Sequence, residues 1–145
     1  MIKFDKVMNK AYTIRRDLCK SKIIEFCLST HDTNTFYFDE LDASNSRMDR
    51  VMAPPAYIGI LGKKAWSGFY KELNLDPNFV LMTKFHVKYY DIIKPHVDYL
   101  TEARIVKLTE KEKYYFFEIH HKVTDPHQKI VATLDIGLGY PKSEG

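Results

Sequence analysis

The chain has 145 residues, of which 45% are hydrophobic and 28% are charged, a composition that excludes a disordered or membrane-spanning chain. Its 22 basic and 19 acidic residues are mixed along the sequence and give a net charge of +3, which excludes the strong basic surface of a nucleic-acid-binding protein. No apolar run approaches the ~20 residues needed to cross a bilayer, and residues 1–10 lack the apolar core of a signal peptide. We therefore expect one cytoplasmic domain over residues 1–145, with its core at about residues 12–138 and with neither a nucleic-acid nor a membrane partner.

A short strand and a helix are predicted before residue 31. Tyr12 and Ile14 alternate with polar residues within residues 11–16, as they do in an edge strand with one buried face. The next apolar residues favour a helix that ends near Thr30, and Asp17 or Ser21 is its expected N-cap.

The two cysteines are expected to be free thiols. Cys19 and Cys27 lie in the predicted helix, where their separation of eight positions corresponds to ~12 Å at ~1.5 Å per residue. A disulfide requires Cα atoms less than ~7 Å apart. We therefore expect reduced thiols, with Cys27 packed in the core.

A long helix is predicted from Ala53 to Asn74, and the rest of the chain is organised around it. Pro54 and Pro55 suit a first helical turn, because their missing N–H groups would be unpaired there. Asn74 tolerates the left-handed conformation that ends many helices. Apolar residues at helical spacing cover most of its sides. They are Ile58, Leu61, Ala65, Phe69 and Leu73, with Tyr57, Ile60, Trp66 and Tyr70 beside them.

Long strands are predicted for the remainder of the chain. Phe85, Val87 and Tyr89 alternate with polar residues and predict a strand with one buried face. Alternation returns over residues 114–123 and from Ile130 to Leu138, and the tail from residue 140 is expected to fray. Hairpin-linked strands imply an antiparallel sheet. The expected class is α+β, with a long central helix wrapped by an antiparallel β-sheet, the arrangement called a hotdog fold.

The segment HDTNTFYFDE at residues 31–40 and the helix VMAPPAYIGILGKKAWSGFYKELN resemble the MaoC-like family of (R)-specific hydratases and dehydratases, hotdog proteins that act on acyl thioesters. The family motif, approximately D-x-N-P-x-H-x-D, falls here on Asp32, Asn34, Thr35, Tyr37 and Asp39. The closer resemblance is to the accessory subunit of heterodimeric (3R)-hydroxyacyl-ACP dehydratases, in the FAS1-like dehydratase group, and it covers roughly residues 12–138.

The chain departs from the family motif at the residue that moves protons. In the family an Asp/His pair transfers protons, but Tyr37 stands here in place of the histidine. A phenol with a pKa of ~10 is a hydrogen-bond donor at pH 7 and a poor base, and Asp32 is a weak base unless burial raises its pKa. The resemblance therefore implies a degenerate catalytic pair of Asp32 and Tyr37. It also implies substrate-binding positions at Asn34, Ala56, Tyr57 and Gly59.

The start of the central helix is expected to contact the thioester. Free N–H groups at Ala56 and Tyr57, at the positive end of the helix, would face its carbonyl oxygen. Gly59, Gly62 and Gly68 each cost ~1 kcal/mol relative to Ala inside a helix, which indicates that sheet backbone or an acyl chain packs closely there.

The resulting hypothesis is an acyl-thioester-binding subunit of a hydratase or dehydratase for 3-hydroxyacyl or 2-enoyl thioesters. It requires no cofactor or metal, its substrate is an acyl-CoA or acyl-carrier-protein thioester, and a second hotdog chain supplies the catalytic histidine in a heterodimer. A homodimer is the alternative assembly. The alternative functions are a hotdog acyl thioesterase and a non-enzymatic acyl-thioester-binding module.

Each motif residue also has a purely structural interpretation. Asp32 and Asn34 are residue types that bind neighbouring backbone N–H groups in turns and caps. Tyr37 is equally typical of a core aromatic residue. His120 and His121 are expected on opposite faces of one strand, where they cannot share a metal ion.

Overall fold

The computed structural model describes residues 4–38, 51–63 and 65–142. The last motif residue, Asp39, lies outside the described residues. The described strands are β1 (Tyr12–Asp17), β2 (Leu81–Tyr89), β3 (Asp98–Glu110), β4 (Tyr114–Thr124) and β5 (Ile130–Pro141). The described helices are η1 (Phe4–Lys6), α1 (Lys20–Thr30), η2 (Thr35–Tyr37), η3 (Pro55–Tyr57), α3 (Ile58–Lys63), α4 (Trp66–Leu73) and η4 (Pro77–Phe79).

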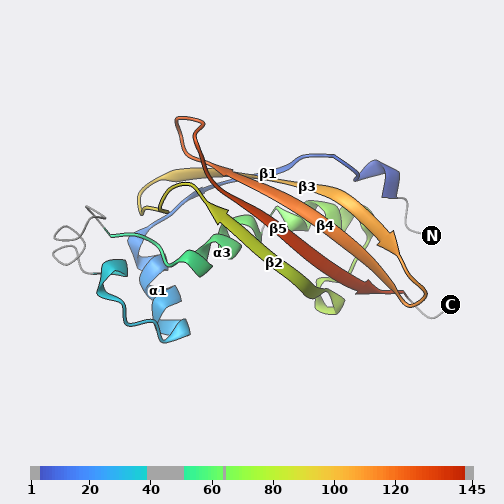
Figure 1. Ribbon diagram of the computed structural model, residues 1–145, viewed down its shortest axis with the longest axis horizontal. Coiled ribbons are helices and arrows are strands. Elements are labelled where there is room, and N and C mark those ends of the chain that lie inside the picture. The colour runs from blue at the N-terminus through green and yellow to red at the C-terminus, as the bar shows by residue number, and fades with distance from the viewer. Residues whose placement is uncertain (1–3, 39–50, 64, 143–145) are drawn as a thin grey trace.

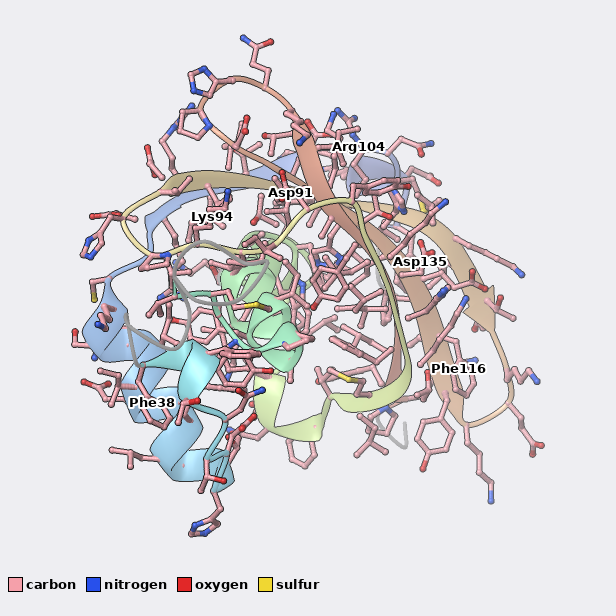
Figure 2. All side chains as sticks on the ribbon, turned by 60° about the vertical axis from the view of Figure 1, so that its left-hand side comes forward. Phe38, Asp91, Lys94, Arg104, Phe116 and Asp135 are labelled. Atoms are coloured by element: carbon pink, nitrogen blue, oxygen red, sulfur yellow. The ribbon has the colours of Figure 1, made fainter. Side chains whose placement is uncertain are left out.

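The five strands form one antiparallel sheet in the order β1-β3-β4-β5-β2. Over residues 98–105 of β3 and 117–124 of β4 exposed or half-buried residues alternate with buried ones, because successive side chains point to opposite faces of a sheet. The sheet curves across α3 and α4, and α1 lies at the end of the molecule opposite the two termini (Figure 1). Side chains fill the space between the sheet and these helices (Figure 2). This is the predicted hotdog arrangement.

The central helix occupies the predicted stretch but is not continuous, so the prediction of one long helix was wrong in this respect. A 3₁₀ turn begins it at Pro55, α3 ends at Lys63, and α4 begins at Trp66. The Ala65 N–H donates to the Gly62 carbonyl at 3.0 Å, a bond across three residues that is tighter than the α-helical pattern. A periodic apolar stripe does not encode such local tightening. The predicted end is confirmed, because Asn74 adopts the left-handed conformation with φ 53°.

The helical segments bury the predicted face against the sheet. The residues predicted at helical spacing, Ile58, Leu61, Ala65, Phe69 and Leu73, are all buried. The three glycines of the central helix lie against side chains of the strands. The expectation that sheet backbone packs closely against them was therefore wrong. A Cβ atom at Gly59 would lie 3.5 Å from the Phe85 ring, and one at Gly68 would collide with the ring of Tyr12.

Three local predictions are corrected by the structure. The N-cap of α1 is Cys19, and neither Asp17 nor Ser21, because β1 continues through Asp17 before the chain turns. Phe85 and Tyr89 are exposed by 45% and 38%, because β2 is an edge strand whose helix-facing side is only partly covered. The final strand does not fray at residue 140 but continues to Pro141.

The cysteine prediction is confirmed. Cys19 and Cys27 are free thiols, and Cys27 is buried in the core. No helix in the described part of the chain is long and apolar enough to span a membrane.

Candidate functional site

The motif residues form a turn directly after α1. His31 ends the helix in the left-handed conformation, and the Asp32 N–H then donates to the Cys27 carbonyl at 2.9 Å. The Asp32 carboxylate accepts the Asn34 N–H at 3.1 Å, and the Asn34 side chain in turn accepts the Phe36 N–H at 3.1 Å. These are the local turn bonds that Asp and Asn favour. The structural interpretation of both residues is therefore supported.

Tyr37 is the buried member of this turn, with 9% of its surface exposed. Burial raises the pKa of its hydroxyl, and electrostatic repulsion from the Asp32 carboxylate and from Cys27, once that thiol ionises, raises it further, while a hydrogen bond from the Asn34 side chain acts in the opposite direction. The predicted residues Asp32, Asn34 and Tyr37 are thus close together. Their environment keeps the phenol protonated at neutral pH, as a hydrogen-bond donor beside a carboxylate.

The predicted residues at the start of the central helix lie on η3 and α3. The expectation of a free N–H at Tyr57 was wrong, because this group donates to the Pro54 carbonyl at 2.9 Å within the tight 3₁₀ turn. Ala56 is exposed in the same turn, and Gly59 is half-buried beneath the Phe85 ring. The buried ring of Tyr57 packs edge-on against Phe26 of α1, with ring centroids 5.3 Å apart.

A cavity of about 650 Å³ lies between α1, the end of β1 and the central helix. Its size is that of a typical small-molecule site, which spans ~300–1,000 Å³. Buried apolar side chains of Leu18, Tyr57 and Leu61 line it together with Phe26 and Ile60. Charged groups also reach it, so the cavity combines an apolar wall with polar partners, as acyl-thioester binding requires.

Several polar residues of the cavity were missed in the sequence, among them Arg16 and Lys22. Arg16 reaches from β1 to the central helix, where its guanidinium donates to the Ile60 carbonyl at 3.2 Å. Lys22 of α1 pairs with Glu25 at 2.7 Å. Neither residue belongs to a recognisable motif, and only the meeting of β1, α1 and α3 in space reveals them.

The structure therefore brings the predicted residues into two groups. Asp32, Asn34 and Tyr37 form one group at the end of α1, and none of them lines the cavity, whereas Tyr57 does. The groups are connected through the backbone, since the Met52 N–H donates to the Phe36 carbonyl at 3.2 Å. Among the described residues no three His, Cys, Asp or Glu side chains gather closely enough to hold a metal ion.

Solved structures place the fold in the MaoC-like hotdog class. A MaoC-like dehydratase matches with a TM-score of 0.86 at 12% identity, over 97% of this chain but only 44% of its own. The HadBC (3R-hydroxyacyl-ACP dehydratase) complex from Mycobacterium tuberculosis matches with a TM-score of 0.82 at 12% identity, over 92% and 96% of the two chains. The ChsH1-ChsH2 complex from the same organism matches with a TM-score of 0.72 at 17% identity, over 94% and 85%.

The sequence itself identifies the family. The FAS1-like dehydratase domain region matches residues 9–134, which is most of the chain, and the chain belongs to this family. A search of curated proteins found no match. The predicted family and fold are thus confirmed, while the accessory-subunit assignment stays a prediction.

Proposed function

We propose that the chain is the acyl-thioester-binding subunit of a MaoC-type hydratase or dehydratase that acts on 3-hydroxyacyl or 2-enoyl thioesters. The single observation that carries this proposal is the buried side chain of Tyr37, whose pKa is raised by burial and by the nearby Asp32. Dehydration needs a base for the α-proton and an acid for the leaving hydroxyl, and both work best with a pKa near 7. The pKa of Tyr37 is raised from 10, and therefore lies even farther from 7 than that of an ordinary tyrosine. The chain is thus expected to bind a thioester without efficiently transferring its protons.

The cavity between α1 and the central helix is the proposed site of the acyl thioester. Its apolar wall, formed by Tyr57, Ile60 and Leu61, suits an acyl chain. Arg16 and Lys22 are cationic groups of the kind that binds the phosphate groups that CoA and the phosphopantetheine of an acyl-carrier protein have in common; they share the cavity with the carboxylates of Asp17 and Glu25, and Lys22 is paired with Glu25.

A second hotdog chain is proposed to complete the enzyme by pairing with β2. This edge strand has one unpaired side, and unpaired backbone groups at a sheet edge favour pairing with another strand. Exposed apolar side chains accompany the edge, with exposed fractions of 38–58%; they are Phe79, Leu81, Met82, Phe85 and Tyr89. The MaoC-like dehydratase that matches over only 44% of its length has room in one chain for two such domains, which supports this assembly. A partner of the same sequence would make a homodimer instead.

The test compares the chain alone with the chain plus a hotdog partner that carries an intact Asp/His pair, in the hydration of a 2-enoyl thioester. We expect binding but little turnover by the chain alone, and turnover by the pair. Robust hydration by the chain alone would refute the proposal. Release of free thiol would identify a thioesterase, and binding without any active partner would identify a binding module.

A substitution provides the matched test of the motif. Tyr37→His is expected to raise hydration by the chain alone, within the ~10²–10⁴-fold that general acid–base catalysis contributes. Tyr114→His makes the same change at an exposed tyrosine of β4 and is expected to have no effect on turnover. Equal rates for both variants would mean that Tyr37 does not lie beside the reacting atoms.

A further inference from the structure

A buried histidine on β4 contacts the central helix where that helix is interrupted. The Trp66 indole N–H, at the start of α4, donates to His121 Nε2 at 2.6 Å. Both rings lie in the core, with Trp66 exposed by 8% and His121 by 0%. Because Trp66 is the first residue of α4, this hydrogen bond connects the junction between α3 and α4 to the sheet.

The same imidazole also supports the end of α3. A Cβ atom at Gly62 would lie only 3.1 Å from His121 Cδ2, so the absence of a side chain at Gly62 is what lets α3 approach the ring. Adjacent Leu61 lines the cavity described above. His121 is thus in contact with both helical segments.

The hydrogen bond defines the protonation of His121. Nε2 accepts the hydrogen bond from the Trp66 indole N–H and therefore has no proton of its own. The single proton of the neutral ring is thus on Nδ1. Nδ1 is buried and has no hydrogen-bond partner among the described residues. A second proton would turn Nε2 into a donor facing the Trp66 donor, and it would add a charge to a ring that is fully buried.

We propose that Trp66 and His121 form an acid-sensitive latch, in which proton uptake by His121 breaks the contact that seats the junction of α3 and α4 on the sheet. This inference is independent of the proposed enzyme activity. It concerns the coupling between solution pH and the central helix.

Among the described residues, the neighbours of His121 on the inner face of the sheet include no carboxylate that could pair with a charged ring. Its inner-face neighbours carry no titratable group; they are Ala103 on β3, Leu134 on β5, Ile119 and Val123 on β4, Thr101 on β3, and Gly62 of α3. The nearest charged groups, His120 and Asp135, pair with each other at 2.8 Å on the opposite face of the sheet. Burial lowers the pKa of His121 to about 4, an effect that His120 increases and that Asp135 and nearby backbone groups oppose.

The direction of the pH effect follows from this lowered pKa. The unfolded chain takes up the proton near pH 6.5, whereas the folded chain does so only near pH 4, so stability is complete above pH 6.5 and is lost as the pH falls toward 4. Through His121 alone, the equilibrium constant for unfolding is about 30-fold larger at pH 5 than at pH 7.5. The paired carboxylates of Asp91, Glu102 and Asp135 have lowered pKa values and act below this window.

Urea unfolding at pH 7.5 and pH 5.0, followed by fluorescence, tests the latch. Trp66 is the single tryptophan of the chain, so the signal comes from the latch itself. The wild-type unfolding constant is expected to rise about 30-fold at the lower pH. His121→Gln keeps an acceptor but cannot titrate, and this rise should disappear. His120→Gln, on the adjacent position of the opposite face, should retain it.

Equal pH responses of the wild type and His121→Gln would overturn the proposal. Should His121→Gln fail to fold, an NMR titration of the wild-type imidazoles decides the question. A His121 ring that stays neutral to about pH 4, with the Trp66 indole signal changing as the ring titrates, supports the latch. A His121 ring that titrates near 6.5 in the folded protein would overturn it.

Discussion

Replacing Gly68 with Ala tests how tightly α4 packs on β1. An alanine Cβ at this position would lie 2.9 Å from Tyr12 Cε1 and closer still to Cδ1. The Tyr12 ring has little room to move, because it is 8% exposed and packs edge-on against Phe69, with ring centroids 5.9 Å apart. The substitution therefore forces either the ring or the helix to shift.

Two opposing terms determine the size of the effect. Ala is favoured over Gly in a helix interior by ~1 kcal/mol, whereas overpacking a core costs roughly 1–3 kcal/mol. Because the approach is well below normal contact distance and the Tyr12 ring is confined, we expect the second term to prevail. The predicted net loss is about 1–2 kcal/mol in the free energy of unfolding.

Gly59→Ala is the matched control on α3. Its added Cβ would lie 3.5 Å from the half-exposed Phe85 ring, an ordinary contact distance, so this variant should be unchanged or stabilised by up to ~1 kcal/mol. Urea unfolding of both variants measures the difference. A Gly68→Ala protein as stable as the wild type would refute the reasoning. Adding Tyr12→Leu to Gly68→Ala should recover part of the loss, since coupled neighbours are not additive.

Phe69→Ala, at the fully buried centre of α4, is expected to cost ~3–5 kcal/mol in unfolding experiments, and a loss below ~1 kcal/mol would contradict the described core. Asn34→Ala removes the bond that caps η2 and is expected to cost ~0.5–2 kcal/mol, with Phe36 amide exchange as the local measurement. Cys19, whose pKa is lowered by the Ser21 hydroxyl, should react with a thiol reagent faster and at lower pH than buried Cys27, whose pKa is raised by burial; equal rates would disprove this difference. Phe85→Asp should reduce assembly in gel filtration, and an unchanged elution volume would exclude the β2 edge as the contact.

The fold could be predicted because strong periodic patterns coincide with its elements. The helical stripe ending at Asn74 is confirmed, since burial of one face and a left-handed cap are both local properties of the sequence. The interruption near Ala65 could not be predicted, because the apolar spacing of Leu61, Ala65 and Phe69 continues through it unchanged. The same is true of β2, where alternation indicated a buried face but position at the edge of the sheet left Phe85 exposed.

The candidate site was predictable only where its residues are close in sequence. Asp32, Asn34 and Tyr37 share one turn, so their proximity follows from a motif of six residues. The cavity draws Arg16 from β1, Lys22 from α1 and Tyr57 from η3. Only the fold brings these residues together, and the sequence contains no spacing rule that identifies them.

The interruption of the central helix separates two tasks. α4 anchors the domain through Phe69 and the Tyr12 contact at Gly68, whereas α3 provides Ile60 and Leu61 to the cavity. A change of pocket shape that is confined to α3 therefore leaves the anchoring contacts of α4 in place. Because the cavity is the proposed site of the acyl thioester, we expect relatives with different ligand preferences to diverge most in this short segment, which makes α3 the place to redesign selectivity without rebuilding the scaffold.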